Sequence, residues 1–196
     1  MRKRWLMIAA IIGIVLIGIV AVGPIMSNVE TPDYEVIKAE GHIEIRQYAP
    51  MIVAEVQVKG GREDAMGDGF RLLADYIFGG NIAHKNIAMT APVQQQYHGD
   101  DWQISFVMPA EYTMETLPKP LNNLVTLKRV PGKKFVVIIF SGRNSETNVK
   151  EHEKKLMIYI KAQNLSVTGS PKYAFYNPPW TLPNLRRNEV MVEIQG

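Results

Sequence analysis

The sequence predicts an α+β domain that contains a β-β-α-β-β pattern twice and follows one transmembrane helix. Three observations predict this fold class. An uncharged run of 22 residues comes first, strand-like and helix-like periodicities follow, and these periodicities occur in the same order in both halves of the remaining chain. About 165 residues follow the N-terminal region, which is enough for one domain with its own core and too few for two large ones.

The N-terminal region has the pattern of a membrane anchor. Residues 5–26 carry no charge and would span roughly 33 Å as a helix, which crosses a bilayer. A cleaved signal peptide is the alternative, although its apolar region is usually only about 7–15 residues long. The basic residues 2–4 precede the span, so the positive-inside tendency places residues 1–4 in the cytoplasm. We therefore expect a single-pass membrane protein that contacts the lipid bilayer through residues 5–26, with residues 27–33 as a tether and residues 34–196 as an extracytoplasmic domain.

The charge and the cysteine content exclude several classes of function. The chain has 22 Lys and Arg against 19 Asp and Glu, and residues 2–4 account for the whole surplus of three. The body of the protein is therefore neutral and lacks the basic stripe of a nucleic-acid-binding protein, so we expect no nucleic-acid partner. The absence of cysteine excludes disulfides, thiolate zinc sites, cysteine nucleophiles and covalent CxxCH haem attachment.

The first half of the domain is predicted to contain strands on both sides of one helix. The segment 51–59 alternates apolar and polar residues, which is typical of a strand with one buried face. Pro92 cannot donate to a strand ladder and should break its strand at an edge or a bulge. The expected elements of this half are strands at His42–Tyr48 and Met51–Lys59, a helix at Glu63–Phe78, and strands at Ile87–Gln95 and Trp102–Met108.

The second half is predicted to repeat this order. Residues 135–140 are six consecutive apolar residues, which indicates a central strand covered on both faces. The residues at matched places in the two halves differ, so the repeat is one of pattern and spacing, and coincidence stays open. The expected elements are strands at Val125–Val130 and Lys134–Ser141, a helix at Glu146–Asn164, and strands at Lys172–Tyr176 and Glu189–Ile194.

The first predicted helix also provides candidate binding residues. Its apolar stripe consists of Met66, Phe70, Leu73, Ala74 and Ile77. Leu72 and Tyr76 lie one turn apart beside this stripe and leave apolar surface next to the core, while Arg71 projects from the polar side nearby. This surface can stack against a flat apolar ligand and offer a cation to an anionic tail. The alternative is that Leu72 and Tyr76 simply meet the rim of the sheet.

Other motifs of catalysis or metal binding are missing from the sequence. The histidines at 42, 84, 98 and 152 lack metal-ligand spacing, and there is no GxSxG, Walker or GxGxxG motif. We therefore expect no dedicated metal or nucleotide site. Ten methionines suit an irregular apolar ligand, although packing in the core is the ordinary explanation for them.

Three segments resemble the SOUL haem-binding protein family. They are YEVIKAEGHIEIRQYAPMIVAEV from Tyr34, KNIAMTAPV at 85–93 downstream of DYIFGGN, and YNPPWTLPNLRRNEVMVEI from Tyr176. The resemblance covers about residues 34–194 in the order of the family. It implies a duplicated α+β domain with a distorted barrel-like sheet and two helices, and non-covalent binding of haem or another tetrapyrrole without an established enzymatic role. It also implies that the porphyrin lies against the first helix with basic residues near its propionates.

The expected function is therefore that of a membrane-anchored tetrapyrrole carrier, buffer or sensor without chemistry of its own. The candidate haem-binding residues are Arg71, Leu72 and Tyr76, with weak axial ligation because His84 lies in a loop. One alternative is an enzyme acting on a small apolar substrate, with Tyr76, Glu55 or His84 as acid or base. Another is an interaction module at the membrane. The RRNE segment has two interpretations. It could contact the ligand, or Arg186 and Arg187 could hold the last strand through ion pairs with Glu189.

Overall fold

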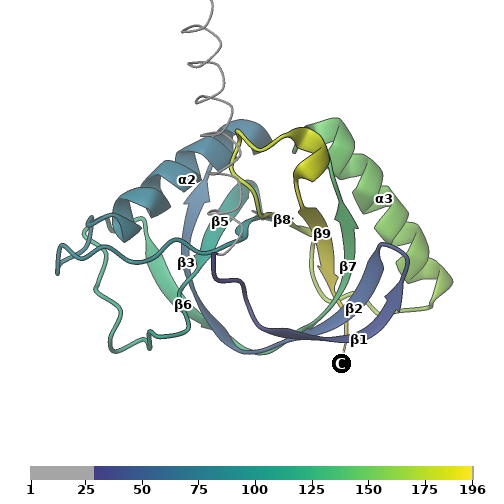
Figure 1. Ribbon diagram of the computed structural model, residues 1–196, viewed down its shortest axis with the longest axis horizontal. Helices are drawn as coiled ribbons and strands as arrows, with labels where there is room; N and C mark the ends of the chain where they lie inside the picture. Colours follow the sequence, from purple (N-terminus) through teal and green to yellow (C-terminus); the bar gives the residue numbers. More distant parts are fainter. Residues whose placement is uncertain (1–28, 196) are drawn as a thin grey trace, which may run out of the picture.

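The computed structural model describes residues 29–195, so the expected anchor at 5–26 lies outside the described residues. Within residues 29–195, no helix is long and apolar enough to cross a membrane. The described part forms a nine-stranded antiparallel sheet that curls into a half barrel, with two α-helices on its outer face (Figure 1). Its elements are β1 (Tyr34–Glu40), β2 (Ile43–Tyr48), β3 (Met51–Val58), α2 (Arg62–Ile77), β4 (Val93–His98), β5 (Asp101–Val107), β6 (Thr126–Val130), β7 (Lys134–Phe140), α3 (Glu146–Ala162), β8 (Lys172–Phe175), the 3-10 helix η2 (Pro183–Leu185) and β9 (Asn188–Glu193).

The strand order shows the expected repeat as an internal two-fold arrangement. The sheet runs β1-β2-β7-β9-β8-β4-β5-β3-β6. Exchanging β2 with β6, β3 with β7, β4 with β8 and β5 with β9 gives the same order in reverse, apart from β1. The first strand of each half pairs with the other half, because β2 pairs with β7 and β6 pairs with β3. The two β-β-α-β-β halves therefore exchange their first strands.

The strand predictions hold for the buried strands and fail at two other places. In β7, Val136 and Ile138 face α3 while Phe135 and Val137 face the inside of the curl, which confirms a strand covered on both faces. The strand expected at 87–95 begins only at Val93. Before it, the Ala91 N–H is bonded to the Glu30 carbonyl and leaves the ladder, and Pro92 has no N–H. The edge strand β1 was missed, because its side chains are mostly exposed and give no alternating pattern.

The helix α2 buries a different face from the one expected. Leu73 and Ile77 are buried as predicted, but Phe70 is exposed and rests edge-on against Phe106 with 5.4 Å between the ring centroids. The difference arises at Gly69, where an added Cβ would lie 2.7 Å from Ile104 Cβ. The missing side chain lets the helix backbone approach β5 closely, so Gly69 occupies the centre of the buried face.

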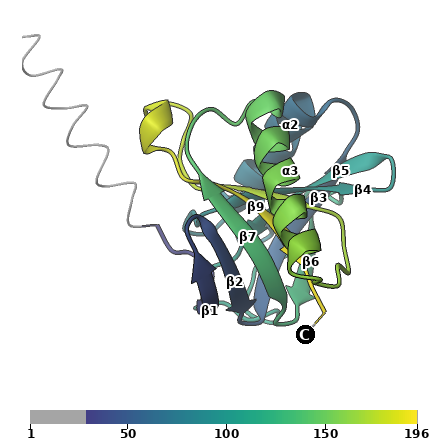
Figure 2. The same ribbon diagram turned by 90° about the vertical axis from the view of Figure 1, so that its right-hand side faces the viewer.

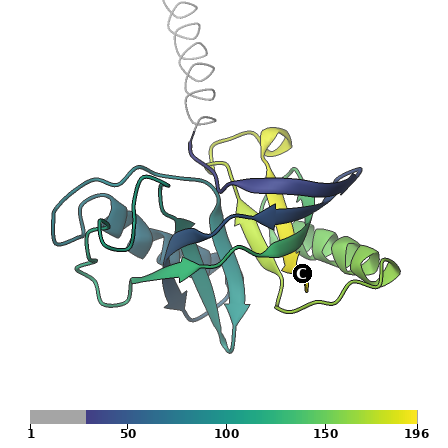
Figure 3. The ribbon, with the colours of Figure 1, turned by 90° about the horizontal axis from the view of Figure 1, so that it is seen from below.

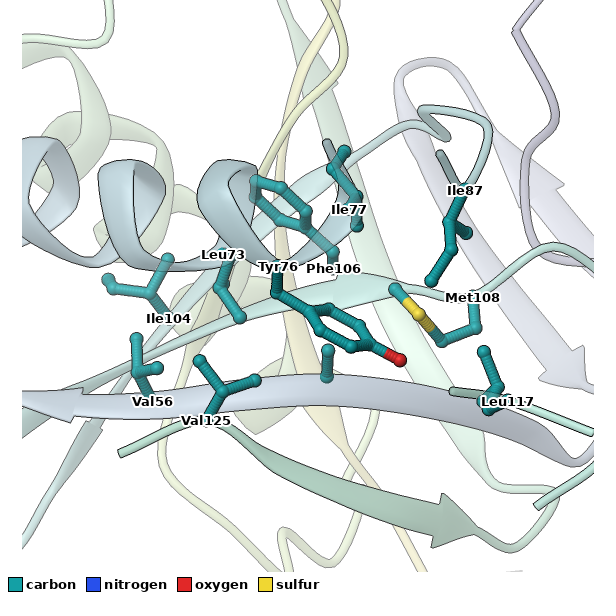
Figure 4. Packing of buried hydrophobic residues seen from close by; sticks show 11 residues of the cluster. Val56, Leu73, Tyr76, Ile77, Ile87, Ile104, Phe106, Met108, Leu117 and Val125 are labelled. Atoms are coloured by element: carbon teal, nitrogen blue, oxygen red, sulfur yellow. The ribbon is translucent and has the colours of Figure 1, made fainter. Parts of the chain in front are cut away.

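Three apolar clusters hold the curl. The α2 cluster lies between α2 and the β3–β5 region, the α3 cluster lies between α3 and β7–β9, and the inner cluster lies on the opposite face of the sheet. Figure 4 shows the α2 cluster, in which Leu73, Tyr76 and Ile77 point from the helix toward the sheet. The buried members of the inner cluster are Tyr48, Phe135, Val137, Ala174 and Met191.

Candidate functional site

The three candidate residues on α2 lie in three different environments. Arg71 is exposed and forms an ion pair with Asp68 on the same helix. Leu72 is half-buried and packs against the α2 cluster from its flank. Tyr76 has 0% exposure and lies inside the α2 cluster, where its hydroxyl donates to the Pro118 carbonyl at 2.9 Å (Figure 4). The expectation that the Tyr76 ring offers a surface beside the core is therefore corrected.

The close approach of α2 explains why Tyr76 is buried. Tyr76 follows Gly69 by seven residues, which is almost two full helical turns, so both lie on the same side of α2. Burial raises the pKa of Tyr76 to about 12. Arg71 is two residues from Gly69 and lies on the opposite side, in solvent. Of the three candidates, only Arg71 and the flank of Leu72 reach the surface.

A larger apolar surface lies just beyond the C-terminal end of α2. Its members come from two loops, and we call Phe78, Ile82 and Leu121 the α2-end surface. Their side chains are 62%, 59% and 57% exposed. The loops lie side by side, because the Ile82 N–H donates to the Lys119 carbonyl at 2.9 Å and the Leu121 N–H donates to the Gly80 carbonyl at 3.0 Å. Sequence reasoning missed this surface because its two segments are separated by β4 and β5.

The loop that carries Phe78 and Ile82 is held by a buried asparagine. Asn81 has 0% exposure, and its side chain donates to the carbonyls of Tyr76 and Lys85 at 3.0 and 2.7 Å. Its Oδ1 also accepts the Lys85 N–H at 3.2 Å. These bonds fix the position of His84, whose backbone adopts a positive φ of 49°. His84 therefore lies in a loop whose backbone is held by hydrogen bonds, and not in a flexible one.

Basic side chains surround the α2-end surface. His84 and Lys85 follow Ile82 in the same loop, Lys119 precedes Leu121 in the other, and all three are exposed. The solvent side of α2 itself is acidic, since Asp64, Asp68 and Asp75 lie on it. The Asp75 carboxylate lies against Gly80 in the first loop, so the α2-end surface has two exposed lysines and one carboxylate close to it.

Two hollows in the described residues are small compared with a tetrapyrrole. The larger one, of about 250 Å³, lies where the segment 30–33 meets β3, β6 and the loop after β5. The smaller one, of about 20 Å³, lies on the inner face near Lys172. Pockets for drug-sized ligands usually measure about 300–1,000 Å³. Neither of these two hollows is large enough to enclose a tetrapyrrole.

The inner face is filled by a buried ionic network instead. Arg46, with 0% exposure, donates to both carboxylate oxygens of Glu189 at 3.1 Å, and Arg187 reaches the same carboxylate at 2.6 Å. Tyr48 accepts from Arg46 at 3.0 Å, and Tyr176 donates to Glu189 at 2.9 Å. Burial and the neighbouring carboxylate raise the pKa of Tyr176. The predicted ion pair with Glu189 is therefore confirmed for Arg187, whereas Arg186 donates instead to the carbonyls of Thr181 and Pro179.

The acid and base groups of the enzyme alternative do not meet. Glu55 alternates along β3 with Ala54 and Val56, which pack with Tyr76 in the α2 cluster. The sheet thus lies between Glu55 and Tyr76. His84 is in the exposed loop after α2. Among the described residues, no group of three or more His, Asp or Glu side chains could hold a metal ion.

The comparisons with known proteins agree with the architecture. No curated protein matches the chain. Among solved structures, the C-terminal domain of EcmrR matches with a TM-score of 0.61 at 12% identity, covering 83% of this chain and 98% of that one. An uncharacterized conserved protein from Listeria innocua matches with a TM-score of 0.57 at 14% identity, covering 78% and 92%. A hydrolase from the same organism matches with a TM-score of 0.55 at 13% identity, covering 81% and 94%.

These structural similarities show the α+β fold alone, because the identities are low. The sequence of residues 29–193 matches the family described as SOUL heme-binding protein. This match covers most of the chain and the whole of both halves. The chain therefore belongs to the SOUL heme-binding protein family.

Proposed function

We propose that the protein binds haem or another tetrapyrrole non-covalently at the α2-end surface and acts as a carrier, buffer or sensor. The observation that carries this proposal is the presence of three exposed apolar side chains on two firmly joined loops in a member of a haem-binding family. A porphyrin is flat and apolar on its faces, so an exposed apolar surface suits it. Leu72 is a further partly exposed apolar side chain on α2.

The charges around the α2-end surface suit the two propionates of haem. Lys85 and Lys119 are exposed beside the apolar side chains, and an ammonium group binds a carboxylate through charge-assisted hydrogen bonds. Arg71 adds a more distant cation, weakened by its ion pair with Asp68. We expect the apolar contact to supply most of the binding. Covering about 200 Å² contributes about 5 kcal/mol at ~25 cal/mol per Å², before the cost of association.

A titration of the full chain in detergent with hemin tests the site. The double variant Phe78→Asp/Ile82→Asp should bind hemin at least about ten-fold more weakly, a loss of roughly 1.4 kcal/mol or more. Ile158→Asp on α3 is the matched control, because its side chain is 60% exposed and lies in the other half. Equal binding by the double variant and the wild type would place the ligand elsewhere.

Iron ligation is tested separately with iron-free protoporphyrin. We expect the two porphyrins to bind with similar affinity, because the apolar faces are the same. His84→Ala should then change the Soret band of the hemin complex only slightly. A loss of hemin binding in His84→Ala with normal protoporphyrin binding would instead make His84 the axial ligand.

We also propose that the domain is anchored to a membrane on its extracytoplasmic side. The support is the uncharged segment 5–26 and the three basic residues that precede it. A reporter that works only outside the cytoplasm should be active when it is fused after Gly196. Activity of a cytoplasmic reporter at the same position would reverse this topology.

A further inference from the structure

The two matched hairpins of the repeat differ in one large feature. The β4–β5 hairpin closes with the two residues 99–100, whereas the corresponding β8–β9 hairpin closes with the twelve residues 176–187. Because the first hairpin forms with a two-residue turn, a connection of twelve residues is not needed to close the second. We call residues 176–187 the β8–β9 loop. Its two ends supply Tyr176 and Arg187 to the bonds with Glu189, while the large apolar residues between them are left exposed.

The β8–β9 loop presents apolar side chains to solvent. Trp180, Leu185 and Leu182 are 68%, 66% and 63% exposed, the three largest fractions among the large apolar side chains of residues 29–195. Exposed apolar side chains that gather in one place mark a contact with another apolar body. The loop therefore has the composition of a docking element.

The β8–β9 loop is held in shape by its own polar contacts. Arg186 donates to the Thr181 carbonyl at 2.8 Å and also to the Pro179 carbonyl. The Gly142 N–H donates to the Pro183 carbonyl at 2.8 Å and joins the loop to the end of β7. Three prolines further limit its backbone. The apolar side chains are thus presented by a stiff loop, which lowers the entropic cost of docking.

The position of the β8–β9 loop indicates what it contacts. The η2 helix within this loop and the start of the described chain at Val29 lie on the same side of the molecule (Figures 2 and 3). The segment 30–33 is bonded to the body, because Glu30 accepts the Ala91 and Ala110 N–H groups at 2.9 and 2.6 Å and Asp33 accepts the Ala49 N–H at 3.0 Å. The proposed anchor ends at residue 26, so the domain is held within a few residues of the bilayer.

We infer that the β8–β9 loop inserts Trp180, Leu182 and Leu185 into the interface of the membrane that anchors the chain. This inference rests on the anchoring in the proposed function. Tryptophan favours the interface because its ring is apolar and its N–H is polar. Arg143 is exposed at the base of the loop, next to Gly142, and can donate to the phosphate groups of lipid headgroups. The loop and the anchor then form two contacts that fix the orientation of the domain on the membrane.

Site-specific labelling of the full chain tests this inference. The chain has no cysteine, so Leu182→Cys introduces a unique site for an environment-sensitive fluorophore. Ile158→Cys on α3 is the matched control, since its exposure of 60% is close to the 63% of Leu182. Both variants are reconstituted into phosphatidylcholine and phosphatidylglycerol vesicles that contain a lipid with a nitroxide near the headgroup. The label at 182 should be quenched at least about three-fold more strongly than the label at 158, as expected for insertion about 5–10 Å deep.

The experiment distinguishes a failure of the membrane anchor from a failure of the loop insertion. Protein that does not float with the vesicles overturns the anchor and, with it, the membrane contact of the loop. Protein that floats but shows equal quenching at 182 and 158 overturns the loop insertion alone. A blue-shifted label at 182 that the nitroxide lipid does not quench would place the loop on a protein surface, which also overturns the insertion.

Discussion

The two β-β-α-β-β halves share their topology and differ in what their loops carry. In the first half, long loops follow α2 and β5, and together they form the α2-end surface. In the second half, the link after α3 is short and the extra length is in the β8–β9 loop. Each half thus adds its exposed apolar side chains at a different place. The sheet and helices therefore maintain the fold, while differences in loop length create the surfaces available for binding.

The inner faces of the halves differ as well. The pair Gln94 and Ser105 on β4 and β5 corresponds by register to Ala174 and Glu189 on β8 and β9. In the first half, this pair makes a long hydrogen bond of 3.5 Å. In the second half, the corresponding carboxylate binds the buried Arg46 and the partly exposed Arg187. The second half therefore depends on buried charge where the first half does not.

The largest expected effect follows from the exchange of first strands. Residues 29–110 alone would lose β6 as the partner of β3, and β2 would lose its partner β7. We expect this fragment to remain unfolded, because both losses expose sheet edges and apolar faces. Dispersed NMR signals and a sharp thermal transition for the isolated fragment would show that the halves are independent.

The second prediction tests the buried charge of the second half. Glu189→Ala removes the fully buried carboxylate partner of Arg46 and leaves only the partly exposed Glu44, so the free energy of unfolding should fall by about 3 kcal/mol. The matched change Ser105→Ala in the first half should cost about 1 kcal/mol or less. Urea denaturation of both variants measures the two losses. Equal losses would mean that the two inner faces contribute alike.

The elements predicted from the sequence are those whose burial alternates along the chain. The strand β3 and the two helices repeat with a clear period, and β7 is a continuous apolar run. The edge strand β1 was missed because an exposed strand has no such period. The strand β4 was predicted to begin too early, because the N–H of Ala91 is bonded to Glu30 outside the sheet.

The candidate site was harder to predict because it depends on contacts between distant residues. Arg46 and Glu189 are 143 positions apart, and no local pattern links them. The α2-end surface likewise joins two loops that only the fold brings together. Tyr76 was expected at the surface because the apolar stripe was centred on Phe70 and not on Gly69. A glycine gives no hydrophobic signal, although here it marks the closest contact of the helix.

The third prediction tests that close contact. Gly69→Ala places a methyl group against Ile104, so the free energy of unfolding should fall by about 1–3 kcal/mol. Gly67→Ala on the same helix is the matched control, because an added Cβ there meets nothing within 4 Å. It should raise stability by up to about 1 kcal/mol, since alanine favours the helix. A stabilising effect at both positions would show that α2 can move away from the sheet.

The smallest expected effects come from removing the hydroxyl of one buried tyrosine in each half. Tyr76→Phe removes the bond to the Pro118 carbonyl and should cost about 1 kcal/mol at neutral pH. Tyr173→Phe should cost a similar amount with more dependence on salt, because its hydroxyl bonds to Glu153 at 2.6 Å and to Lys150 at 3.2 Å.

Alkaline pH should reduce the difference in stability between the wild type and each of the two phenylalanine variants. Burial raises the pKa of both tyrosines to about 12, while the unfolded chain titrates near the ordinary value of 10. Between about pH 10 and 12 the folded state therefore binds more protons than the unfolded state, and the stability of the wild type falls as pH rises. Each phenylalanine variant lacks one of these groups, so its disadvantage should narrow over that range. Urea denaturation at a series of pH values measures this change, and a constant difference from pH 7 to 12 would mean that the two hydroxyls titrate alike in both states.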